Sequence, residues 1–146
     1  MATRPASSGP PKPPAQRTIL VVDDDQDSRD SIRGILEAGL AHASVLEAAS
    51  VSEAKKILGA TDVHLILSDY QMPGDDGLEF LKDVRSRHDV PTILMTAYPA
   101  MGLAVKALQE AKIQGFAVKP LAKEQVLNLV KRALEKQPTF DYAAPK

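Results

Sequence analysis

Five strand-like segments alternate with five helix-like segments along this chain, and this alternation restricts the possible folds more than any other feature. The strand-like segments are short and apolar, with many β-branched residues, at 18–22, 44–48, 63–68, 92–95 and 115–118. The helix-like segments carry apolar residues at helical spacing, at 27–40, 50–58, 77–87, 101–111 and 123–136. Such an alternation predicts an α/β fold whose parallel strands are covered by helices on both faces.

Right-handed crossovers leave few topologies for a chain of this size. We predict a flavodoxin-like three-layer sandwich of five βα units, with a parallel five-stranded sheet in the order 2-1-3-4-5. Ser50 and Glu53 form a capping box that starts the second helix. Residues 69–76, which include Pro73 and Gly74, are predicted to form a loop.

The two ends of the chain differ from its centre. Residues 1–17 hold five of the eleven prolines and few apolar side chains, which predicts a flexible, proline-rich arm. A docking peptide for a partner is the alternative reading of that arm. Residues 137–146 are predicted to be a tail, either an authentic end or the start of a linker, so that 18–136 form the domain.

Composition excludes several classes of site. The chain has no cysteine, which removes disulfides, thiolate nucleophiles and zinc–thiolate centres. A formal net charge of −1 gives no indication of binding to nucleic acid or of insertion into a membrane. No apolar run approaches the roughly 20 residues that cross a bilayer, and a cytoplasmic location is expected.

Polar residues follow the central strands at the points where ligands bind in a parallel sheet. The acids 23–25 follow the first strand, Asp69 the third, Thr96 the fourth and Lys119 the fifth. Each of them alone is usually a turn or cap residue. Because the first and third strands are neighbours in the predicted order, Asp23, Asp24 and Asp69 should converge.

Three carboxylates in one cleft need a cation to offset their repulsion. An all-oxygen donor set favours a hard divalent ion, and Mg²⁺ is the first candidate. With Lys119 as a second positive charge and Thr96 as a hydroxyl, the residues predict a phosphoryl-transfer site.

Four motifs, in this order and spacing, carry a family resemblance. They are VVDD at 21–24, LSDYQMPGDDGLEFL at 67–81, MTA at 95–97 and FAVKP at 116–120. On these motifs the chain resembles the receiver domains of two-component response regulators, of which the chemotaxis regulator is the single-domain type. The resemblance leaves open whether the chain is a stand-alone receiver or a piece of a longer regulator.

The resemblance implies roles for the acidic residues. Asp69 would be the phosphoacceptor. Asp24 would bind Mg²⁺, or Mn²⁺ as a substitute, directly, and Asp23 would assist directly or through a metal-bound water. The backbone carbonyl of Gln71 would supply a further metal ligand.

The resemblance also assigns the residues around the phosphoryl group. Thr96 would donate a hydrogen bond to it and Lys119 would pair with it, with the Lys119-Pro120 peptide bond in the cis form. Phe116 falls at the switch position and, having no hydroxyl, would act by burying its ring. Tyr98, together with Gln71, would line the pocket without a predicted direction of effect.

By this resemblance the chain is a phosphorelay switch rather than an enzyme, and assists only its own phosphorylation and dephosphorylation. A phosphohistidine on a sensor kinase or phosphotransfer protein would be the donor. Thr96 would then shift and Phe116 turn inward, which would change the surface made by 101–111, 115–118 and 123–136. That surface would bind a downstream protein or a second copy of the chain.

Two other readings compete with the switch. A phosphohydrolase with an aspartyl nucleophile matches Asp23-x-Asp25, but its pattern wants Thr or Val where this chain has Asp27. An interaction module on the same fold that needs no phosphorylation is disfavoured by the intact acid, lysine and hydroxyl positions. Nucleotide binding has no support, because neither GxxxxGK[ST] nor GxGxxG occurs.

Overall fold

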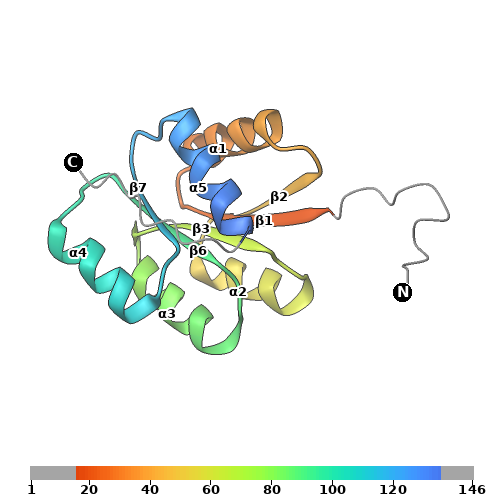
Figure 1. Ribbon diagram of the computed structural model, residues 1–146. Coiled ribbons are helices and arrows are strands. Elements are labelled where there is room, and N and C mark those ends of the chain that lie inside the picture. The colour runs from red at the N-terminus through yellow and green to blue at the C-terminus, as the bar shows by residue number, and fades with distance from the viewer. Residues whose placement is uncertain (1–15, 136–146) are drawn as a thin grey trace, which may run out of the picture.

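The computed structural model describes residues 16–135, which form a sheet with helices on both sides (Figure 1). The predicted tail and residues 1–15 of the predicted arm lie outside this range. Arg17, which we assigned to the arm, instead begins the first strand. Its N–H donates to the carbonyl of His42 at 2.9 Å, and Arg17 pairs with Ala43 of the neighbouring strand. The arm boundary at residue 17 was therefore wrong, because strand pairing reaches back to that residue.

The central sheet has the predicted order. Its strands are β1 Arg17–Val22, β2 Ala43–Ala48, β3 Leu65–Asp69, β6 Thr92–Thr96 and β7 Gly115–Val118. The helices are α1 Gln26–Gly39, α2 Val51–Ala60, α3 Gly77–Arg87, α4 Met101–Lys106 and α5 Lys123–Leu134. The strands lie in the order β2-β1-β3-β6-β7 and all neighbours are parallel. The order 2-1-3-4-5 and the flavodoxin-like α/β fold are confirmed.

The alternation of side chains along β1 explains the two helical layers. Ile19 and Val21 pack into a core with α1 and α5, whereas Leu20 and Val22 pack into a second core with α2, α3 and α4. Figure 1 shows these two groups of helices on opposite sides of the sheet. All four side chains are fully buried, as expected for a strand covered on both faces. Within residues 16–135, no helix is both long and apolar enough to cross a membrane.

Two segments differ from their predicted form. Residues 69–76 contain a small antiparallel hairpin, β4 Gln71–Met72 and β5 Asp75–Asp76, which turns at Gly74 with φ 77°. Strands of two residues are too short to produce an alternating pattern. The predicted helix 101–111 continues beyond α4 as a π-helix, η2 Ala107–Ala111. Over five residues, the apolar spacing of a π-helix cannot be distinguished from that of an α-helix.

Aspartates cap two of the helices that begin beside the carboxyl edge of the sheet. The Asp25 carboxylate accepts from the N–H of Asp27 at 3.2 Å and starts α1. Asp76 accepts from the N–H of Leu78 at 2.8 Å and starts α3. These caps satisfy N–H groups that have no partner within the helix, and they end the loops that follow β1 and β3. One half of the predicted capping box of α2 is present, since Ser50 Oγ accepts from the N–H of Glu53. In place of the other half, Glu53 Oε1 accepts from the N–H of Ala49, one residue before the N-cap.

Candidate functional site

Three carboxylates meet at the carboxyl edge of the sheet, as the strand order predicted. Val22 pairs with Ser68, so the residues that follow them, Asp23 and Asp69, leave neighbouring strands at the same level. Carboxylate oxygens of Asp23, Asp24 and Asp69 all lie within 4.8 Å of one another. Asp23 is fully buried, Asp69 is buried and Asp24 is exposed, so the cluster opens to solvent at Asp24.

Lys119 reaches the same place from the end of β7. Its Nζ lies 2.7 Å from Asp23 Oδ2 and 3.2 Å from Asp69 Oδ1. Because β6 lies between β3 and β7, the lysine side chain must extend past the end of β6 to make these contacts. The Lys119-Pro120 peptide bond is cis, as the family resemblance implied.

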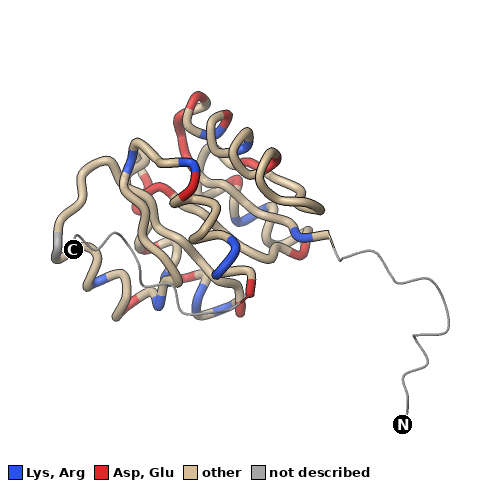
Figure 2. The backbone as a smooth tube through the Cα atoms, turned by 45° about the horizontal axis from the view of Figure 1, so that its top comes forward, with Lys and Arg blue, Asp and Glu red and all other residues tan. Residues whose placement is uncertain are grey.

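Within residues 16–135, the side chains that contact this cluster do not balance its charge. Burial raises the pKa of Asp69 above its usual value; the Lys119 charge opposes this rise, and the carboxylates of Asp23 and Asp24 add to it. Burial would lower the pKa of Lys119, but its contacts with Asp23 and Asp69 outweigh this effect and raise that pKa. The three carboxylates have one ammonium group, that of Lys119, to offset their charge. A net negative charge therefore remains at this cluster. Figure 2 shows acidic and basic positions interspersed over the rest of the described chain.

This donor set fits a hard divalent cation. Carboxylate oxygens are the ligands that Mg²⁺ prefers, and one of the three, Asp24, is open to the water that Mg²⁺ retains. The residues that would hold Mg²⁺ are therefore Asp23, Asp24 and Asp69. Gln71 lies two residues beyond Asp69, in the hairpin that leaves the same edge, and the role of its carbonyl stays a prediction.

Thr96 lies beside the site as predicted, whereas Phe116 departs from the position predicted before phosphorylation, and the switch roles of both stay predictions. Thr96 ends β6, and its carbonyl accepts from the N–H of Lys119 at 2.8 Å. Its hydroxyl accepts from the N–H of Tyr98 at 3.1 Å. The Phe116 ring is already in the core with 3% exposure, so the structure shows the inward position that we had expected only after phosphorylation. Tyr98 is 76% exposed, at the start of the loop that follows β6.

Sequence reasoning missed two residues that shape the site. Arg29 is buried, and its Nη1 donates to the carbonyl of Asp23. A signal was available, because Arg29 lies on the same helical stripe as Ile32 and Leu36. For Gly77, by contrast, no pattern in the sequence of its helix predicts a close contact with Asp69. A Cβ at that position would lie 1.9 Å from the carbonyl oxygen of Asp69.

We expect Asp69→Asn to raise the melting temperature of the metal-free protein at neutral pH. The pKa of Asp69 is raised on folding, so the folded state holds this proton more tightly, and stability falls as pH rises from the ordinary carboxyl pKa through the raised one. An amide removes this penalty, with a gain of about 1 kcal/mol or a few degrees. Thermal unfolding in EDTA should show the gain at pH of about 7 and its decline toward about 4. A gain that did not change with pH would contradict this account.

Comparison with known proteins identifies relatives of the described domain. Residues 19–131 match the family model of the response regulator receiver domain. The hydrogenase transcriptional regulatory protein HoxA of Cupriavidus necator is 35% identical over 123 residues, which cover 84% of this chain and 25% of that protein. The DNA-binding transcriptional regulator NtrC of Escherichia coli is 39% identical over 126 residues, which cover 82% of this chain and 25% of NtrC. The chain thus spans about a quarter of the length of these curated relatives.

Solved structures agree with this match. The signal receiver domain of an HD domain-containing protein from Pseudomonas fluorescens superposes with a TM-score of 0.78 at 25% identity, covering 84% of this chain and 97% of that one. A CheY-like response regulator receiver domain protein from Methanospirillum hungatei superposes with a TM-score of 0.75 at 28% identity, covering 84% of this chain and 96% of that one.

Proposed function

Because the chain belongs to the response regulator receiver domain family, we propose that it is a switch that accepts a phosphoryl group on Asp69. The observation that carries the proposal is the meeting of four charged groups from three strand ends. Lys119 contacts Asp69, and the oxygens of Asp69 lie within 4.8 Å of those of Asp23 and Asp24. The donor would be a phosphohistidine on a sensor histidine kinase or a histidine phosphotransfer protein.

The transfer is a displacement at phosphorus. A carboxylate oxygen of Asp69 forms the new O–P bond while the N–P bond of the phosphohistidine breaks. The imidazole nitrogen keeps the bonding electron pair and then takes up a proton. Bound Mg²⁺ would supply positive charge to the phosphoryl oxygens. Lys119, which already contacts Asp69, supplies the positive charge that the chain itself contributes.

The surroundings of Asp23 and Asp69 favour Asp69 as the acceptor between these two buried acids. Asp23 has a fully buried side chain, and its Oδ2 already accepts from Lys119 at 2.7 Å. Its Oδ1 accepts from the N–H of Asp25 at 3.0 Å, so each oxygen already accepts one hydrogen bond and keeps a second lone pair for a metal ion. Asp69 keeps 11% side-chain exposure and is held less closely by Lys119, at 3.2 Å. A donor can therefore approach Asp69, whereas Asp23 is suited to hold the metal and the lysine.

The output of the switch would leave through α4, η2, β7 and α5. Thr96 and Lys119 are joined by a backbone hydrogen bond between the ends of β6 and β7, so a movement of one is transmitted to the other. Phe116 lies three residues before Lys119 in β7, within the core that α4 and η2 also line. A downstream protein or a second copy of the chain would bind this surface with different affinity in the two states. We include a cytoplasmic location and no direct contact with nucleic acid in the proposal.

Acetyl phosphate tests the proposal. With Mg²⁺ we expect one phosphoryl group per chain by intact mass, with labelling slowed at least about tenfold in EDTA. The same samples should show altered amide hydrogen exchange in α4, η2, β7 and α5. A chain that stays unlabelled with Mg²⁺ would refute the switch and leave the phosphorylation-independent module. Repeated turnover of a small phosphate ester would instead favour the phosphohydrolase.

A further inference from the structure

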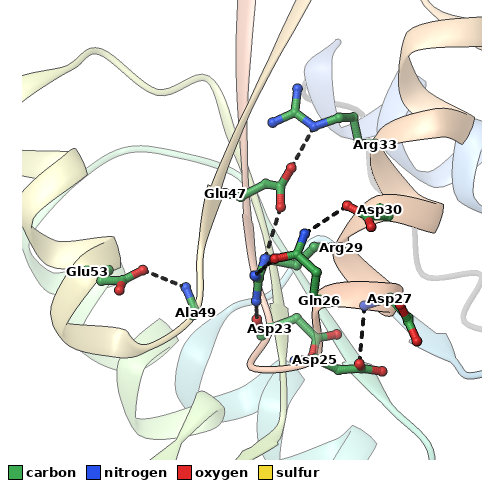
Figure 3. Close-up of polar contacts among 10 residues, drawn as sticks. All are labelled: Asp23, Asp25, Gln26, Asp27, Arg29, Asp30, Arg33, Glu47, Ala49 and Glu53. Atoms are coloured by element: carbon green, nitrogen blue, oxygen red, sulfur yellow. Dashed lines mark hydrogen bonds and ion pairs between the residues drawn. The ribbon is translucent and has the colours of Figure 1, made fainter.

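Arg29 is a charged residue on the buried stripe of α1, next to the acidic cluster but not in contact with its carboxylates. Only 10% of its side chain is exposed. Its Nε donates to Glu47 Oε1 at 3.0 Å, its Nη2 donates to Gln26 Oε1 at 2.6 Å, and its Nη1 donates to the carbonyl of Asp23. Figure 3 shows the guanidinium between Glu47 and the turn that carries Asp23. Three different groups thus orient one guanidinium.

Asp23 is held at every polar atom it has. Its N–H donates to the carbonyl of Ala48 at 3.0 Å, and its two carboxylate oxygens accept from Asp25 and Lys119. The carbonyl of Asp23 is the remaining polar atom, and Arg29 is its donor. This carbonyl belongs to the peptide unit that leads directly into Asp24. Its orientation therefore sets the direction in which the chain continues to Asp24.

The orientation of the Asp24 carboxylate depends on this backbone more than the orientations of the Asp23 and Asp69 carboxylates do. Asp24 is exposed, whereas Asp23 and Asp69 are buried and packed against the end of the sheet. On one side of it lies Asp23, bound by Arg29; on the other lies Asp25, the N-cap of α1. Among metal sites generally, residues that orient the ligands without touching the metal change affinity by about tenfold or more when they are removed.

We infer that Arg29 is a positioning residue for the proposed metal site, because by holding the Asp23 carbonyl it orients the Asp24 carboxylate for Mg²⁺. The inference rests on the proposed function. The Arg29 charge is paired with Glu47, so it does not compete with Mg²⁺ for the carboxylates. Lysine cannot replace arginine here, since an ammonium cannot bond three separated acceptors through a planar fork.

Arg33 provides a matched control on the same helix. It contacts the other oxygen of the same carboxylate, with Nε 2.6 Å from Glu47 Oε2. Figure 3 shows Glu47 between the two arginines, with Arg33 on the side away from Asp23. Substitution of Arg33 therefore weakens the link between α1 and β2 without removing a donor from Asp23. Its side chain is 36% exposed, so the protein should tolerate the change.

The test is calorimetric titration of MgCl₂ into wild type, Arg29→Lys, Arg29→Ala and Arg33→Ala, with urea unfolding of each in EDTA. We expect about a tenfold weaker Mg²⁺ affinity for both Arg29 variants and a change of less than about twofold for Arg33→Ala. Backbone NMR should show shifted amides at Asp24 and Asp25 in both Arg29 variants but not in Arg33→Ala. Arg29→Lys keeps a positive charge beside Glu47 and should therefore fold. It allows the Mg²⁺ affinity to be tested even if Arg29→Ala does not fold.

Two results would overturn the inference. Folded Arg29→Lys with the Mg²⁺ affinity of wild type would show that the Asp23 carbonyl needs no arginine. An equal loss of affinity in Arg33→Ala would assign the effect to Glu47 or to the stability of α1. Failure of the proposed function looks different, because wild type itself would then bind no Mg²⁺ and take no label. That result would end both proposals together.

Discussion

Asp69→Asn should take no phosphoryl group from acetyl phosphate in the presence of Mg²⁺, under conditions in which wild type takes one. An amide oxygen is a far weaker nucleophile than a carboxylate oxygen, and the acyl phosphate that we propose for Asp69 would have no counterpart on asparagine. The expected loss is roughly a thousand-fold or more, the size seen when a reacting group is removed. Intact-mass spectrometry over time measures it. The effect is on chemistry and not on folding, because the metal-free variant is expected to be more stable than wild type.

A control variant, in which another carboxylate is changed to an amide, shows whether the loss of labelling comes from Asp69 itself or from the loss of one negative charge. Asp62→Asn removes the same charge from an exposed residue that precedes β3, at the opposite edge of the sheet from Asp69. That variant should be labelled at the wild-type rate. Stoichiometric labelling of Asp69→Asn would refute the assignment, and peptide mapping would then show whether Asp23 or Asp24 carries the group.

Gly77→Ala should destabilise the protein by about 2–3 kcal/mol and should also weaken the site. The added Cβ would lie 1.9 Å from the carbonyl oxygen of Asp69 and 2.9 Å from Cα of Tyr70. Both are backbone atoms, so no side-chain rotation relieves the overlap. The N–H of Gly77 also donates to the carbonyl of Tyr70 at 2.8 Å, which holds α3 against the segment that carries the proposed phosphoacceptor, Asp69. Relief of the overlap therefore requires the backbone to move, either at Asp69 and Tyr70 or at the start of α3. Urea unfolding and calorimetric Mg²⁺ titration measure the two effects.

Gly34→Ala is the control for the change from glycine to alanine. Gly34 lies inside α1, and an added Cβ would meet nothing within 4 Å. Alanine is preferred over glycine in a helix, so this variant should gain about 0.5–1 kcal/mol. If Gly77→Ala were as stable as wild type and bound Mg²⁺ equally well, the close approach of α3 to Asp69 would have no consequence for the site.

The main elements and the site acids could be predicted because they depend on local pattern and on a general rule of topology. The segment 19–22 is apolar without interruption, which indicates a strand covered on both faces, and these four residues of β1 are fully buried. The handedness of crossovers left few topologies, and the flavodoxin-like order chosen among them placed the first and third strands side by side. From that order alone, Asp23 and Asp69 had to leave the sheet at the same edge.

Other features depended on distances that no local pattern encodes. The hairpin in 69–76 and the π-helix at Ala107–Ala111 are too short to leave a periodic signal. Arg17 was assigned to the arm because the prolines before it suggested a disordered segment, whereas pairing with Ala43 places it in β1. The inward position of Phe116 depends on the packing of the helices against the sheet.

The sequence by itself determined which residues stand at the strand ends, and so which chemical groups the site can contain. Only the tertiary structure decided how those groups are held: the contact of Arg29 with the Asp23 carbonyl, the reach of Lys119 to Asp69, and the approach of Gly77 to the backbone of Asp69. The physical reason is one of range. Periodicity and turn chemistry act between residues a few positions apart, whereas these contacts join atoms whose separation is set only when sheet and helices pack together.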